Sequence, residues 1–168
     1  MTVTETMRQD YEVASEGAVR HWEIPYARLT DASPTASLPA EVTSLTTGCS
    51  LTGTILTVDA DDEVAVIDFT SSMVYWHEVR NVRTYDGAEA TWGVINIGDE
   101  VYYDHSATMP AGVYLSTSPL GDAGQTNTRF GWVVPRNDTD MALFAKGDAT
   151  ASTEECAIMQ LGAGSAAT

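Results

Sequence analysis

The sequence predicts an all-β protein, a compact barrel or sandwich of about nine short strands preceded by an extended N-terminal arm. Short runs rich in Val, Ile, Thr, Tyr, Phe and Trp recur along the chain, and turn-forming residues separate them roughly every 8–12 residues. No stretch keeps the apolar period of a helix. Hydrophobic residues make up 43% of the 168, which is enough to build a core.

The N-terminal third is expected to differ from the rest. Residues 1–17 are polar and acidic, a composition that buries too little apolar surface to fold alone. In the next segment Trp22, Ile24 and Tyr26 alternate as in a strand, and Pro25 restricts such a strand to a sheet edge. The Ser-, Thr-, Pro- and Ala-rich residues 29–48 then indicate a long connection.

These features predict three regions: an N-terminal arm and connection (1–45), a β-domain (46–161) and a flexible tail (162–168). Early strands of the β-domain are expected at 50–58, 63–69, 73–79 and 81–85. An acidic turn is expected at 59–62 and a single helical turn at 88–92. Two late strands are expected at 141–146 and 155–161.

The stretch 92–134 is predicted to form a β-meander. Its apolar runs at 100–103, 112–116 and 128–134 alternate with loops that supply turn geometry. In a meander each strand pairs with the next one along the chain. The stretch contains no catalytic constellation.

A formal net charge of −16 is the strongest compositional signal. Lys146 is the only lysine, and the seven arginines are scattered, whereas binding a phosphate backbone needs clustered basic residues. This argues against nucleic acid and against an anionic membrane as partners. No apolar run approaches the ~20 residues of a membrane span, and no signal-peptide pattern is seen.

The sequence contains no recognisable catalytic or metal-binding motif. The acidic turn 59–62 lacks the glycine and glutamate positions of a calcium loop, and His21, His77 and His105 lack zinc-ligand spacing. His77 is expected to be packed or paired and His105 solvated. No P-loop or nucleophile elbow occurs. We therefore expect no catalytic residues, no metal and no cofactor.

The cysteines and tryptophans give weaker indications. Cys49 and Cys156 are expected to be reduced and at least partly buried, with a disulfide between them as the alternative. Trp76 and Trp132 lie in β-type runs and are expected in the core. Trp22 is the better candidate for a contact surface.

The motif GDEVYYD at 98–104, followed by FGWVV at 130–134, resembles a family of small tailed-phage proteins with a GD-x-VY-x-D strand and a later x-G-x-V strand. The resemblance covers roughly residues 45–161. Such proteins are sometimes labelled phage recombinases, but this chain has no ATP site. Residues 1–45 depart from the family, which usually lacks so long an N-terminal segment.

The resemblance implies a capsid decoration, or cement, protein with the architecture of lambda-type head decoration proteins. Such a protein is made in the host cytoplasm and sits on the outer surface of the virion, commonly as a homotrimer that bridges major capsid protein subunits. Strong negative charge suits that location. Contacts with the capsid and between subunits are expected from the arm, through Tyr11, Trp22, Ile24 and Tyr26.

Three alternatives remain. Another virion structural role, such as a head fibre base or a tail component, requires the same kind of β-domain. A carbohydrate-binding β-sandwich requires exposed coplanar tryptophans. An enzyme requires a site formed by residues distant in sequence.

Overall fold

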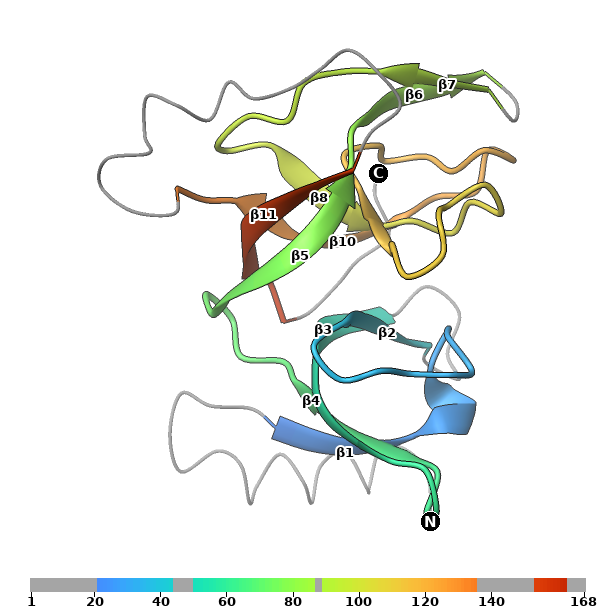
Figure 1. Ribbon diagram of the computed structural model, residues 1–168, viewed down its shortest axis with the longest axis vertical. Coiled ribbons are helices and arrows are strands. Elements are labelled where there is room, and N and C mark those ends of the chain that lie inside the picture. Colours follow the sequence, from blue (N-terminus) through green and yellow to red (C-terminus); the bar gives the residue numbers. More distant parts are fainter. Residues whose placement is uncertain (1–20, 44–49, 87–88, 136–152, 163–168) are drawn as a thin grey trace.

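The computed structural model describes residues 21–43, 50–86, 89–135 and 153–162. It is all-β, as predicted. Eleven strands and one short 3-10 helix, η1 (Tyr26–Arg28), fall within these ranges. They form an N-terminal sheet, a closed barrel and a two-stranded hairpin, with the sheet at one end of the molecule and the hairpin at the other (Figure 1).

The N-terminal sheet contains four antiparallel strands in the order β1-β4-β3-β2. Their bounds are β1 (His21–Pro25), β2 (Pro39–Thr43), β3 (Ser50–Asp59) and β4 (Val64–Asp68). Side chains alternate between the two faces. One face builds an apolar core that includes Ile24, Val42, Ile55, Ile67 and Phe69. The other face carries polar side chains, among them Thr52 and Thr54, which hydrogen-bond to residues of the barrel.

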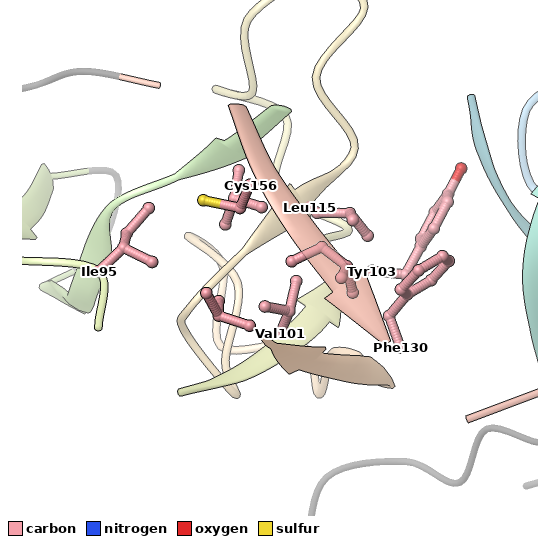
Figure 2. Close-up of a cluster of buried hydrophobic side chains, with 9 residues drawn as sticks. Ile95, Val101, Tyr103, Leu115, Phe130 and Cys156 are labelled. Atoms are coloured by element: carbon pink, nitrogen blue, oxygen red, sulfur yellow. The ribbon is translucent and has the colours of Figure 1, made fainter. Parts of the chain in front are cut away.

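The barrel closes in the order β10-β11-β5-β9-β8. Its strands are β5 (Val74–Arg80), β8 (Glu100–Tyr103), β9 (Leu115–Ser116), β10 (Thr128–Val133) and β11 (Thr153–Gln160). Nine buried side chains form its core, among them Ile95, Val101, Leu115, Phe130 and Cys156 (Figure 2). The hairpin is formed by β6 (Val82–Asp86) and β7 (Glu89–Trp92).

The predicted boundary at residue 45 is wrong for residues 21–43. β1 pairs with β4, and β2 pairs with β3, so this part of the predicted arm belongs to a folded sheet. The reason is the alternation already visible in the sequence, which places Trp22 and Ile24 against the apolar core. The prediction from Pro25 is confirmed, because β1 is an edge strand. Residues 1–20 lie outside the described ranges.

Two local predictions are also wrong. Residues 89–92 form strand β7 rather than a helical turn, because they pair with β6. The stretch 92–134 is not a meander in strand order: β10 pairs with β8, and β9 lies on the other side of β8. Parallel pairing of β9 with β5 completes the barrel. This pairing could not be predicted by assuming that each strand pairs with the next one along the chain. The expected strand at 141–146 lies outside the described residues.

Candidate functional site

The sequence-predicted contact residues do not form one exposed site. Ile24 is 4% exposed and belongs to the core of the N-terminal sheet, so its prediction as a surface anchor is wrong. Trp22 and Tyr26 are partly buried against the same core, and the Trp22 ring lies 5.0 Å from the Phe69 ring between centroids. Tyr11 lies outside the described residues.

An apolar row of exposed and half-buried side chains instead crosses the outer face of the barrel. In the strand register Trp132 on β10 lies opposite Met159 on β11, and Met159 lies opposite Val74 on β5. Directly opposite residues project from the same face of a sheet. Trp76, two residues after Val74, shares that face and is 45% exposed, so its prediction as a core residue is wrong.

The row reaches the surface because only one side of each barrel strand packs into the barrel core. Along β5 the buried His77 and Val79 alternate with the exposed Val74, Trp76 and Glu78. Val74 is 49% exposed. Grouped apolar side chains on an outer sheet face are typical of a protein contact surface. Because residues 73–79 carry apolar side chains on both faces of the strand, the sequence alone does not show which face is buried and which is exposed.

Charged side chains flank the row. Glu78 is exposed beside Trp76 on the same face of β5. At the other end Glu100 lies opposite Trp132, and its carboxylate is 3.4 Å from the guanidinium of Arg129. The row is therefore an apolar centre with a polar edge, the arrangement found in specific protein interfaces.

The seam between the N-terminal sheet and the barrel is polar. On the sheet side it contains Glu41, Thr52, Thr54 and Asp68, all buried. Glu41 is 2% exposed, and its carboxylate accepts hydrogen bonds from Thr128 and from Thr30, the latter at 2.7 Å. Together with hydrogen bonds such as that from Thr52 Oγ1 to the Arg129 carbonyl, 3.1 Å, these contacts hold the two apolar cores in a fixed relation.

His105 is the partner of Glu41 on the barrel side of the seam. Its Nε2 lies 2.7 Å from Glu41 Oε2, so the prediction of a solvated His105 is wrong. Burial would raise the pKa of Glu41, but hydrogen bonds from His105, Thr128 and Thr30 outweigh it and lower that pKa. The hydrogen bond to Glu41 raises the pKa of His105 despite partial burial. The pair is a partly buried ion pair across the seam.

A second group of polar contacts in the seam surrounds His77, which is buried as predicted. Thr54 Oγ1 donates to Gln160 Oε1 at 3.0 Å, and the same oxygen lies 3.0 Å from His77 Nε2. Because that hydroxyl has only one proton, His77 Nε2 must donate to it. Nδ1 then carries no proton and has no partner. Burial lowers the pKa of His77 to about 4, so the ring is neutral at pH 7.

Arg80 connects the barrel to the hairpin. Its guanidinium carbon lies 4.8 Å from the centre of the Trp92 ring, and Nη1 donates to Tyr85 Oη at 3.3 Å and to the Thr108 carbonyl at 3.1 Å. Beside this junction, β7 and the start of β8 enclose a hollow of about 510 Å³ that Trp92 and Tyr102 help to line. Cation–π contact and hydrogen bonds thus fix the hairpin on the barrel.

Other sequence-predicted features have structural roles. The turn at 59–62 is held by Asp59, whose carboxylate accepts from the backbone N–H of Asp61 and Asp62. Cys156 is a buried free thiol in the barrel core, whereas Cys49 lies outside the described residues. Within the described ranges no cluster of three or more His, Cys, Asp or Glu side chains could hold a metal. Nor does this part of the chain contain a helix long and apolar enough to cross a membrane.

Comparisons with known proteins identify no relative of this chain. No protein-family model matches the chain, and neither the curated proteins nor the solved structures searched contain a significant match.

Proposed function

We propose that this chain is a phage capsid decoration protein, which binds the outside of the head shell and bridges neighbouring major capsid protein subunits without catalysing a reaction. The observation that carries the proposal is an apolar row on the outer face of a closed barrel, formed by the exposed Val74 and Trp76 and the half-buried Trp132 and Met159. A structural binding protein requires such a surface.

Charge supports an outer location. A net charge of −16 keeps free subunits apart in solution and gives no affinity for packaged DNA. The apolar row supplies the attraction once the barrel reaches a lattice, because burying apolar surface is favourable whatever the net charge. The resemblance of GDEVYYD and FGWVV to decoration proteins adds a homotrimer as the assembly on the shell.

Co-sedimentation with undecorated, expanded phage heads, read out by electron microscopy, tests the proposal. The intact protein should bind at regular positions. Val74→Ser should weaken binding, whereas Leu120→Ser should not. Both residues are 49% exposed, but Leu120 lies outside the apolar row, so the pair separates a specific contact from general surface polarity.

Four outcomes would contradict the proposal or a part of it. Absence of binding by the intact protein, or equal binding by both variants, would remove the row as the capsid contact. Tubes or rings formed by the protein alone would indicate a tail component. Saturable glycan binding with no head binding would indicate a carbohydrate-binding module. Deleting residues 1–17, which include Tyr11, separately tests whether the arm adds affinity.

A further inference from the structure

A second hollow, of about 420 Å³, lies at the junction of the N-terminal sheet and the barrel. Thr30 and Asp31, from the connection that follows η1, form one side. The end of β8 and the loop that leads to β9 form the other, through residues 103–106 and 109–114. Hollows at the junction of two packed units are common ligand sites.

Aromatic rings form one wall of this hollow. The rings of Tyr103 and Tyr114 are stacked, with 5.9 Å between centroids and 25° between planes. The His105 ring lies 5.8 Å from that of Tyr103. Tyr114 is only partly buried. Aromatic faces attract cations through the negative charge above the ring.

The charges that line the hollow are negative in sum. Asp31 and Asp104 contribute carboxylates, and no lysine or arginine is among the lining residues that the structure describes. His105 is the one lining group that carries positive charge when protonated, and it is paired with the buried Glu41. Arg80, the guanidinium at the nearby hairpin junction, is held by Trp92 and by backbone and side-chain acceptors.

One polar group in the hollow lacks a partner. Tyr103 is 2% exposed as a residue, but its hydroxyl keeps solvent access and makes no hydrogen bond within the described part of the chain. Figure 2 shows this hydroxyl pointing out of the barrel core, toward the N-terminal sheet. Tyr103 also lines the hollow. A hydroxyl that lines a hollow and makes no hydrogen bond within the described residues can accept one from a ligand.

We propose that this hollow binds a guanidinium group, carried on an arginine side chain of a partner protein. The cation would donate to the Asp31 carboxylate and to the Tyr103 hydroxyl, and its plane would lie against the Tyr114 ring. A guanidinium fits better than an ammonium because it is planar, stacks on aromatic rings and presents several N–H donors in one plane. The assignment does not depend on the partner being a capsid protein.

The direct test is an NMR titration of the full chain with N-acetyl-L-arginine methylamide. It should shift the backbone amides of 103–106 and 111–114 in a saturable way. The isosteric, uncharged citrulline derivative should not. The Asp31→Asn and Tyr103→Phe variants should each bind about tenfold more weakly. Asp61→Asn, which makes the same charge change in the exposed turn at 59–62, should bind like the parent protein.

Several results would overturn the assignment. Equal binding of the citrulline or lysine derivative would exclude guanidinium recognition, and unchanged binding by Asp31→Asn would exclude this hollow. Tight binding of free arginine, but not of the blocked form, would exclude a protein side chain as the source. Tyr103→Phe keeps the ring and removes a hydroxyl that has no partner, so it should fold normally. Because no phage heads are used, failure here is distinct from failure of the capsid proposal.

Discussion

Glu41 and His105 form an ion pair across the seam, with 2.7 Å between Oε2 and Nε2, and so join strand β2 of the N-terminal sheet to the loop after β8 of the barrel. The pair links two apolar cores that share no buried apolar residue. Stability and its pH dependence are therefore expected to respond strongly to changes at this one contact.

Raising the pH should weaken the seam. The folded-state pKa of His105 is raised, so its stabilisation is complete below the unfolded pKa and is lost as pH rises through the folded value. Urea unfolding should show stability falling as pH rises above about 6.5, the ordinary pKa of histidine. In His105→Gln this slope should flatten. An unchanged slope would show that His105 does not titrate across the seam.

Removing the carboxylate charge tests the other partner. The folded-state pKa of Glu41 is lowered, so its stabilisation is present above the unfolded value and is lost as pH falls through the folded one. Glu41→Gln leaves His105 without its counter-charge and should cost about 3 kcal/mol near pH 6. The exposed Glu23→Gln, on β1 at the opposite edge of the same sheet, is the control and should cost little. Equal unfolding curves for both variants would contradict the ion pair.

His77 should produce acid sensitivity of the opposite sign to that of His105. Its folded-state pKa is about 4, below the unfolded value, so the unfolded chain takes up the proton first and stability falls as pH drops toward 4. A glutamine can still donate to Thr54 but does not titrate. Between about pH 6.5 and pH 4, the Tm of His77→Gln should therefore fall by less than the Tm of the parent protein. Thermal unfolding at a series of pH values measures both. A parallel decline in both proteins would reject this role.

Gly131 should be intolerant of any side chain. A Cβ built there would overlap the Met159 carbonyl on the adjacent strand β11. Gly131→Ala should therefore force β10 from β11 and destabilise the protein by about 3 kcal/mol in chemical unfolding. At Gly93 the added Cβ would meet its nearest neighbour, Arg83, at 3.4 Å. If Gly93→Ala proved as costly as Gly131→Ala, the close approach of the strands would not be the cause.

Arg80 is predicted to hold the hairpin on the barrel. Arg80→Met removes the cation over Trp92 and the donor to Tyr85 and Thr108, a local loss of about 1–2 kcal/mol. Amide hydrogen exchange of β6 and β7 should accelerate while exchange in the barrel core stays slow. Arg83→Met, at an exposed position of β6, should leave exchange unchanged. Uniform acceleration throughout the protein would instead indicate a global role.

The sequence was informative where local chemistry decides the outcome. Alternation and turn residues located most strands, and Pro25 placed β1 at an edge. Strand order in the barrel was not predictable, because the pairing of β5 with both β9 and β11 joins segments far apart in the chain. Glu41 gave no signal either: a single glutamate in an irregular stretch looks solvated until His105 and Thr128 are brought against it.

The pairing of β5 with β11 has a consequence for how the chain folds. The N-terminal sheet is complete once residues up to Asp68 are available, because all its strands lie within 21–68. The barrel must wait for Thr153–Gln160, which closes against Val74–Arg80. During synthesis the sheet can therefore form early, while the edge of β5 that pairs with β11 stays open until Thr153–Gln160 is made. Contacts so distant in sequence form slowly, so barrel closure is expected to be the final and rate-limiting event of folding.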